Sequence, residues 1–444
     1  MARREDGATG VAPAASTPAD AGAPAAGTRY VVNGGRALRG EVTAAGAKNS
    51  ALAIITAATL AERGETILDN VPQYSDILHL CAILRDLGAE AEWLGPSTLR
   101  VDGRGLSRTK APYNLARKLR GSTYVVGLLL ARLGEAEVAL PGGCDIGSRP
   151  VDFHLKGFQA LGADAWVEHG SIHARARRLV GSKVFIDRSS FGTTVNLMIA
   201  ASRAHGTTVL ENAAQEPEIV DLANFLTAMG VRIRGAGTKL IRIEGAPELT
   251  GTRHEIIPDR LEAGTYLCAA AITAGRVTVR GIIPEHLRTV LLKLEEAGCR
   301  LAEGADWITL EAPRRPTAVD VQTSPYPGFA TDLQSPFVAV MTIAEGVSVV
   351  QETIFDNRFG FTNELLRLGA RIKVDRDVAV IQGVERLTGA PLEAHDIRGG
   401  AALVLAGLAA EGTTEVSGAA NIGRGFQDLE GKMAALGADI RLVP

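Results

Sequence analysis

Apolar and polar positions along the chain follow a pattern that recurs about every 70 residues. An amphipathic stretch with helical spacing ends in a phrase of the form Leu-Gly-Ala, as in FTNELLRLGA, and a strand-like segment follows. The glycines of this phrase recur at a nearly constant interval, which is too regular for chance. The pattern therefore predicts six copies of one structural unit. The six glycines are Gly88, Gly162, Gly230, Gly298, Gly369 and Gly437.

Each unit also contains an earlier Ala-rich stretch that ends in glycine. In AALVLAGLAAEGTTEV the apolar part predicts a helix, Gly412 supplies the left-handed conformation that ends it, and Thr413 and Thr414 begin a strand. Units made of strands and two helices predict an α/β (α+β) fold class. The earlier glycines of the six units are Gly64, Gly134, Gly206, Gly275, Gly346 and Gly412.

The second unit is longer than the others. The interval between its two glycines, Gly134 and Gly162, exceeds the corresponding interval in every other unit, and the surplus falls in PGGCDIGSRP (141–150). Insertions in a single repeat often carry function. We expect a functional loop here, in which the pair Gly142 and Gly143 permits unusual backbone conformations.

The predicted start of the first helix in each unit lies about four helical turns before the earlier glycine, and five of the six residues found there are charged. Free N–H groups and the helix dipole favour anions at helix N-termini, and Lys or Arg there would strengthen a phosphate or carboxylate site. Solvated helix-start charges are the alternative at any single position. The six residues are Lys48, Arg120, Gly192, Arg260, Asp332 and Arg398.

Composition and charge narrow the class of protein. The 444 residues, 46% hydrophobic and 22% charged, are enough for two or three globular domains. A net charge of −3 provides no field for binding nucleic acid or an acidic membrane surface. Apolar runs are far shorter than the ~20 residues of a membrane span. Ala, Gly and Pro make up 17 of residues 1–27, which we expect to be a flexible tail.

The four cysteines show neither a CxxC pair nor ligand-like spacing with histidine, so neither a disulfide framework nor a zinc site is indicated. A soluble protein in a reducing, cytoplasmic setting is expected. Cys81, Cys268 and Cys299 fall in apolar segments and are expected in the core. Cys144 stands in the Gly-rich insertion, where a cysteine taken alone is more often structural than catalytic.

Six motifs carry a resemblance to a known family: GAKNS (46–50), PGGCDIGSRPVDFH (141–154), ENAAQEPEIVDLANF (211–225), TDLQ (331–334), NRF (357–359) and DIRGGAALVLAG (396–407). From about Arg29 to Pro444 the chain resembles the UDP-N-acetylglucosamine 1-carboxyvinyltransferases, enolpyruvyl transferases of peptidoglycan precursor synthesis related to 5-enolpyruvylshikimate-3-phosphate synthase. The resemblance implies a two-domain inside-out α/β barrel with three repeats per domain. Residues 28–47 plus 258–444 would form one domain and residues 48–257 the other, with crossings near Gly46 and Pro258.

The resemblance also implies transfer of the enolpyruvyl group of phosphoenolpyruvate to the 3-hydroxyl of the UDP-sugar, with release of phosphate and without a metal or organic cofactor. Bidentate arginine suits both anionic groups of the donor. Because the donor-binding cations are divided between the domains, their repulsion is expected to favour an open substrate-free form. Donor-binding residues implied by motif match are Lys48, Arg120, Arg149 and Arg424 around the phosphate, Arg358 and Arg398 around the carboxylate, and Asn49, which would also meet the sugar.

Four residues have implied catalytic roles. Asp332 would be the general base near the sugar hydroxyl, a role that can coexist with capping a helix. Cys144 would deliver a proton to C3 of the donor, can form a covalent adduct with it, and would be alkylated by fosfomycin. Lys48 and Arg424 would act on the phosphate.

For the nucleotide, the resemblance implies a uracil strip after the insertion and a diphosphate site at a helix start. His154 continues the strip, although a histidine there is as readily structural. The implied UDP-sugar residues are Asn49, Tyr124, Arg149, Pro150, Val151, Asp152, Phe153, Arg188, Ser190, Phe191, Gly192, Asp332 and Ile354.

Several residues depart from the family pattern on the acceptor side, while the donor cations are retained. Two alternatives therefore stay open: an enolpyruvyl transferase acting on another uridine nucleotide, such as UMP in nucleoside-antibiotic biosynthesis, and a catalytically silent paralogue that binds nucleotide. The intact donor and catalytic residues argue against the second. The departures are Tyr124 for Trp, Phe191 for Val, Thr193 for Ala, Gly360 and Phe361 for Met-His, Ala420 and Asn421 for Tyr-His, and Gly423 for Asp.

Overall fold

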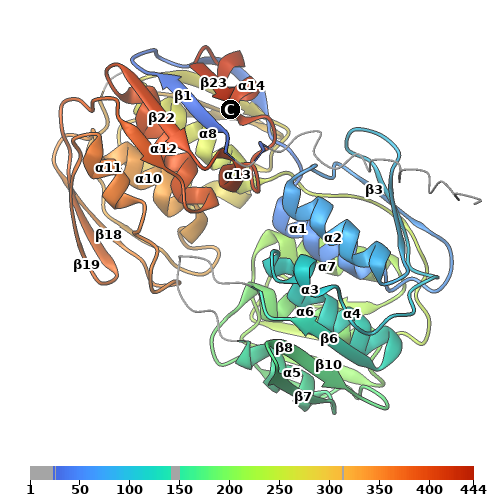
Figure 1. The fold of residues 1–444 in the computed structure, drawn as a ribbon. Helices are drawn as coiled ribbons and strands as arrows, with labels where there is room; N and C mark the ends of the chain where they lie inside the picture. The colour runs from blue at the N-terminus through green and yellow to red at the C-terminus, as the bar shows by residue number, and fades with distance from the viewer. Residues whose placement is uncertain (1–23, 26, 142–150, 313–314) are drawn as a thin grey trace, which may run out of the picture.

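The structure, a computed structural model, describes residues 24–25, 27–141, 151–312 and 315–444, so most of the predicted tail lies outside the described residues. In this part of the chain, small sheets and the helices beside them form two groups, each around its own hydrophobic core (Figure 1). The first core is built from residues between Ala47 and Ile256, and the second from Tyr30 to Ala44 together with residues from Leu261 onward. The predicted mixed α/β class is confirmed.

Three sheets belong to the first group, with strand orders β13-β3-β5-β4, β6-β8-β7 and β11-β12-β10-β9. Neighbouring strands run antiparallel except for β13 with β3 and β9 with β10, which run parallel. The strands are β3 (Thr66–Asp69), β4 (Glu90–Trp93), β5 (Leu99–Asp102), β6 (Glu135–Ala139), β7 (Asp164–Glu168), β8 (Ser171–Arg175), β9 (Lys183–Phe185), β10 (Thr207–Glu211), β11 (Arg232–Arg234), β12 (Leu240–Glu244) and β13 (Arg253–Glu255).

Three further sheets belong to the second group, with strand orders β21-β22-β1-β23, β15-β16-β14-β2 and β17-β18-β20-β19. Each contains one parallel pair: β21 with β22, β2 with β14, and β17 with β18. The strands are β1 (Arg29–Asn33), β2 (Arg39–Thr43), β14 (Arg276–Arg280), β15 (Arg300–Glu303), β16 (Trp307–Glu311), β17 (Val321–Gln322), β18 (Val347–Gln351), β19 (Arg371–Asp375), β20 (Val378–Gln382), β21 (Pro391–Glu393), β22 (Thr413–Ser417) and β23 (Asp439–Val443).

The two N-terminal strands lie with elements from later parts of the chain. Figure 1 shows β1 beside β22 and β23, and Arg29 is the register partner of both Ser417 and Val443. The chain then passes to the first group at Gly46, which forms an isolated antiparallel bridge with Pro258, where it returns.

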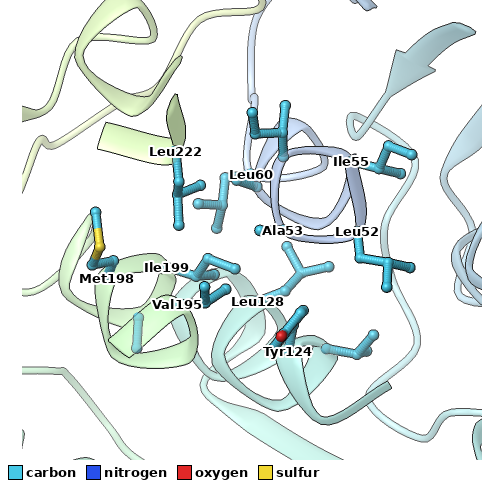
Figure 2. Close-up of a cluster of buried hydrophobic side chains, with 14 of the residues drawn as sticks. Leu52, Ala53, Ile55, Leu60, Tyr124, Leu128, Val195, Met198, Ile199 and Leu222 are labelled. Carbon is cyan, nitrogen blue, oxygen red and sulfur yellow. The ribbon is translucent and has the colours of Figure 1, made fainter. Parts of the chain in front are cut away.

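Helices fill the interior of each group. In Figure 2, side chains from α1, α4, α6 and α7 converge in the first core, and ten of the eleven residues of α1 are buried. A helix that is apolar all round is typical of an interior position. The helices are α1 (Lys48–Ala58), α2 (Ser75–Asp86), α3 (Tyr113–Ala116), η1 (Arg120–Thr123), α4 (Tyr124–Leu133), α5 (Asp152–Ala160), α6 (Phe191–Ala201), α7 (Pro217–Ala228), α8 (Arg260–Ile272), η2 (Pro284–Leu287), α9 (Arg288–Glu296), η3 (Thr331–Leu333), α10 (Gln334–Met341), α11 (Thr362–Arg367), α12 (Ile397–Ala409), α13 (Ala419–Ile422) and α14 (Leu429–Ala435).

The predicted glycine stops are confirmed at eleven of the twelve positions, where φ lies between 67° and 115°. The prediction is wrong at Gly275, because the left-handed residue there is Ala274 with φ 50°. Gly275 is required for a different reason: a Cβ on it would lie 2.4 Å from the Leu38 carbonyl oxygen. Strand β22 begins at Thr413, as predicted.

Three of the four cysteines lie in the described part of the chain. Cys81, Cys268 and Cys299 are free and buried, as predicted for core positions. None of the helices in these ranges is both long and apolar enough to cross a membrane.

Candidate active site

A cavity of about 690 Å³ opens between the two groups of elements, and both groups line it. All six residues predicted at helix starts line this one cavity: Lys48 and Arg120 begin α1 and η1, Arg260 begins α8, and Gly192, Asp332 and Arg398 are the second residues of α6, η3 and α12. The sequence pattern thus led from six separated segments to a single site. Their convergence favours an anion site over five unrelated solvated charges.

Side-chain caps fix several of these helix starts. The Ser190 hydroxyl accepts a hydrogen bond from Thr193 N, and the Asp396 carboxylate accepts bonds of 2.9 Å from the backbone N–H groups of Arg398 and Gly399. Asp259 caps α8 and also accepts from Lys48 N at 3.2 Å, so one carboxylate joins the starts of α8 and α1. Such caps hold a helix start rigid, which suits a site for charged groups.

Asp332 lies between two arginines of the second group. Arg358 Nη2 donates to its Oδ1 at 2.9 Å and Arg398 Nε to its Oδ2 at 3.3 Å. Burial alone would raise the pKa of Asp332, but the charges of Arg398 and Arg358 hold it down at about 2. Asp332 is therefore ionised and paired in this form of the protein.

A second carboxylate, which the sequence reasoning did not single out, pairs with two other predicted donor cations. Asp76, at the start of α2, contacts Lys48 Nζ through Oδ2 at 2.6 Å and Arg424 Nε through Oδ1 at 3.0 Å. Lys48 and Asp76 are buried, and the Arg424 contact joins the first group to the second. Burial lowers the pKa of Lys48, while Asp76 opposes that change.

Glu218 and Arg260 form another pair across the cavity wall. Arg260 Nε donates to Glu218 Oε1 at 3.1 Å and Nη2 to Oε2 at 3.4 Å, with both side chains largely buried. Acids thus lie between the cations contributed by the two groups. The expectation that repulsion opens the substrate-free form counted the cations alone and omitted Asp76 and Glu218, so the structure does not support its premise.

The predicted nucleotide side is also part of the cavity. Phe191 and Gly192 line it beside His154, whose pKa burial lowers to about 4 and whose Nδ1 lies 3.0 Å from Asn196 Nδ2. Arg188 spans the cavity and donates to the carbonyl oxygens of residues 353 and 354 of the second group. The predicted UDP-sugar residues found in the lining are Asn49, Tyr124, Val151, Phe153, Arg188, Ser190, Phe191, Gly192, Asp332 and Ile354.

Four predicted site residues are not among those named in the cavity lining. Cys144, Arg149 and Pro150 lie outside the described residues. Asp152 begins α5 but is exposed and is not among the residues that line the cavity.

Most departures from the family pattern lie away from the cavity. Phe361 is buried in the second core, and Asn421 Nδ2 donates to the Ala394 carbonyl at 2.9 Å. A Cβ on Gly423 would lie 2.3 Å from Pro24 Cδ. Among the departures, only Tyr124 and Phe191 are cavity-lining residues, so the acceptor side differs less from the family than the sequence suggested.

Comparisons with known proteins match nearly the whole chain. The family profile described as EPSP synthase (3-phosphoshikimate 1-carboxyvinyltransferase) matches residues 32–433. UDP-N-acetylglucosamine 1-carboxyvinyltransferase 2 of Symbiobacterium thermophilum is 64% identical over 94% of this chain and 98% of its own length. UDP-N-acetylglucosamine 1-carboxyvinyltransferase of Halothermothrix orenii is 49% identical over 94% and 99%. The crystal structure of the enolpyruvyl transferase NikO from Streptomyces tendae is similar, with TM-score 0.84, 27% identity, and coverage of 95% and 100%.

Proposed function

The chain belongs to the UDP-N-acetylglucosamine 1-carboxyvinyltransferase family of enolpyruvyl transferases, and we propose that it transfers the enolpyruvyl group of phosphoenolpyruvate to the 3-hydroxyl of UDP-N-acetylglucosamine. The observation that carries the proposal is the cavity lined by the six helix-start residues, in a chain that matches a relative of this name at 64% identity. The product would serve peptidoglycan precursor synthesis.

The donor would bind where the cations converge. Lys48, Arg120 and Arg424 would hold its phosphate, with Arg149 from the insertion, and the contact of Lys48 and Arg424 with one carboxylate supports a shared anion position. Arg358 and Arg398 would hold the donor carboxylate, and Asn49 lies in the same lining. Both arginines now donate to the Asp332 carboxylate, which supports this role, because the carboxylate of the donor can take the place of the Asp332 carboxylate.

Proton transfers would involve one group from each side of the donor. When the donor carboxylate pairs with Arg358 and Arg398 in place of Asp332, the pKa of Asp332 would rise. Asp332 could then accept the proton of the 3-hydroxyl while the hydroxyl oxygen attacks C2 of the donor. Cys144 would give a proton to C3. In the second step the Cys144 thiolate would take a proton back from C3 while the bond between C2 and the phosphate oxygen breaks, which restores the double bond; the departing phosphate would take the proton held by Asp332.

The acceptor would lie along α6 and the start of α5. Uracil would contact Arg149, Pro150, Val151, Asp152 and Phe153, and the diphosphate would lie near Arg188 and the capped start of α6. The free N–H groups of a helix start support an anion at that position. Tyr124, Asp332 and Ile354 would contact the sugar.

We also propose that the two groups are the two domains of an inside-out barrel with three repeats each. Separate cores and three small sheets per group support this division, with residues 28–47 and 258–444 in one domain and 48–257 in the other. A cytoplasmic location is proposed from the three free, buried thiols.

Phosphate release tests the function. The protein is mixed with phosphoenolpyruvate and, in separate reactions, UDP-N-acetylglucosamine, UMP or shikimate 3-phosphate. Release with UDP-N-acetylglucosamine alone is expected. Release with UMP instead would mean that the acceptor is another uridine nucleotide. No release with any acceptor would indicate a catalytically silent paralogue. Mass spectrometry after fosfomycin treatment with the UDP-sugar present should find one adduct on Cys144; an unmodified mass would contradict its role.

A further inference from the structure

Asp76 occupies an unusual place among the charges of the cavity. Its two oxygens contact two different cations, Lys48 at 2.6 Å and Arg424 at 3.0 Å, and these come from different groups of elements. The carboxylate is 4% exposed and lines the same cavity. Asp76 is thus positioned to hold the side chains of these two cations, which come from different groups, at a fixed distance from each other.

A simple surface ion pair would not explain this arrangement. Exposed pairs contribute little and are screened by salt, whereas a buried carboxylate between two cations costs desolvation and is retained only with good geometry. Burial alone would raise the pKa of Asp76, but Lys48 and Arg424 lower it. Lys48 and Arg424 both have proposed roles at the donor phosphate. The desolvation cost of burying Asp76 therefore falls where the placement of cations matters for the reaction.

We propose that Asp76 is a positioning residue that holds Lys48 and Arg424 in register across the two groups, so that the donor phosphate meets a preformed pair of cations. The proposal rests on the proposed function. One oxygen orients the ammonium and the other orients the guanidinium, so loss of the carboxylate would remove the group that holds these two cations at their present separation. Preorganised charge of this kind lowers the barrier because nothing has to move during reaction.

Asp76 also affects the charge state of Lys48. Burial lowers the pKa of Lys48, and the neighbouring charges of Arg398 and Arg424 lower it further, while Asp76 acts in the opposite direction. Removing the Asp76 charge would therefore let Lys48 lose its proton at a lower pH. Among the described residues, two further carboxylates act on Lys48: Asp332, held by its own two arginines, and Asp259, which accepts from the Lys48 backbone N–H.

Two substitutions separate charge from geometry. Asp76→Asn keeps the shape and removes the charge, and Asp76→Glu keeps the charge and changes the reach. Asp69→Asn is the matched control, because Asp69 is also ion-paired to an arginine, Arg253 at 2.7 Å, but does not line the cavity. For each protein, kcat and KM for phosphoenolpyruvate are measured from pH 6 to 10, with thermal unfolding in the presence and absence of inorganic phosphate.

We expect Asp76→Asn to lower kcat/KM for phosphoenolpyruvate by at least about tenfold and to shift the basic limb of its pH profile down by at least about one pH unit. Asp76→Glu should lower kcat/KM without shifting that limb, and Asp69→Asn should behave as wild type. The pH above which phosphate ceases to stabilise the protein should fall in the same way for Asp76→Asn.

The proposal is overturned if Asp76→Asn keeps both the limb and a kcat/KM within about twofold of wild type. It is also overturned if kcat/KM falls together with thermal stability while the basic limb of the pH profile does not move. In that case Asp76 would only stabilise the fold. If the wild-type protein releases no phosphate from phosphoenolpyruvate, the proposed function fails. The phosphate-stabilisation profiles then decide the role of Asp76 alone, and identical profiles for wild type and Asp76→Asn reject it.

Discussion

Replacing Glu218 with glutamine should weaken the contact between the two groups of elements. Arg260 would keep its charge and its burial but lose the carboxylate that now lies 3.1 Å from its Nε. The two side chains are 3% and 11% exposed, so water can replace the missing partner only in part. Removing one partner of such a pair costs about 3–5 kcal/mol, because an uncompensated buried charge remains.

The expected change in melting temperature follows from the size of the chain. An unfolding entropy of about 2.1 cal/mol/K per residue gives about 0.9 kcal/mol/K for 444 residues. A loss of about 3–5 kcal/mol then lowers Tm by about 3–5 °C, measured by differential scanning calorimetry at pH 7. The double variant Glu218→Gln with Arg260→Met should recover most of this loss, since no buried charge is left unpaired.

A surface pair provides the control. Glu41 and Arg280 form an ion pair between β2 and β14 with both side chains about half exposed, so Glu41→Gln should change Tm by no more than about 1 °C. If Glu218→Gln changed Tm no more than Glu41→Gln, the reasoning about the buried pair would be refuted. A double variant as unstable as the single one would refute it equally.

Three further predictions concern the cavity and the core around it. Asp332→Asn should lower kcat for phosphate release by about 10²–10⁴-fold, as expected for loss of a general base, and an unchanged kcat would exclude that role. With its pKa lowered to about 4, His154 is neutral when folded but takes up a proton when unfolded below pH 6.5, so stability falls as the pH falls from 6.5 to 4, by about 3 kcal/mol in total; in His154→Gln, calorimetric Tm should lose that part of its pH dependence. Gly127→Ala would place a Cβ 2.6 Å from the Asn196 carbonyl oxygen and force α4 away from α6, costing about 1–3 kcal/mol and lowering Tm, whereas an unchanged Tm would mean that the helices separate freely.

Much of the fold class and of the donor side could be predicted because their signals are local. A glycine that ends a helix is visible in a short stretch of sequence, and eleven of the twelve predicted stops have the expected φ. The helix starts lie at a nearly fixed distance before these glycines. Lys48, Arg260 and Arg398 could therefore be selected without any contact information. The error at Gly275 arose because its requirement is a close approach to Leu38, which belongs to a distant segment of the sequence just before β2.

The acidic partners could not be predicted, because their role depends on distant contacts. Asp76 and Glu218 each lie in the first turn of a helix, where an acid is ordinarily explained by the helix dipole. The partner of Asp76 in the second group is 348 residues away along the chain, and only the assembled structure brings it within hydrogen-bond distance. An acid in the first turn of α2 or α7 was visible in the sequence, but its pairing with a cation of the other group was not.

The position of β1 has a consequence for synthesis on the ribosome. This strand pairs on one side with β22 and on the other with β23, the last two strands of the chain to be made. At about 5–20 residues per second, the strand waits roughly 20–80 s for its partners, while the segment that forms the first core can already fold. During that interval the nascent chain carries an unpaired strand at its leading end, exposed to chaperones and to pairing with neighbouring nascent chains.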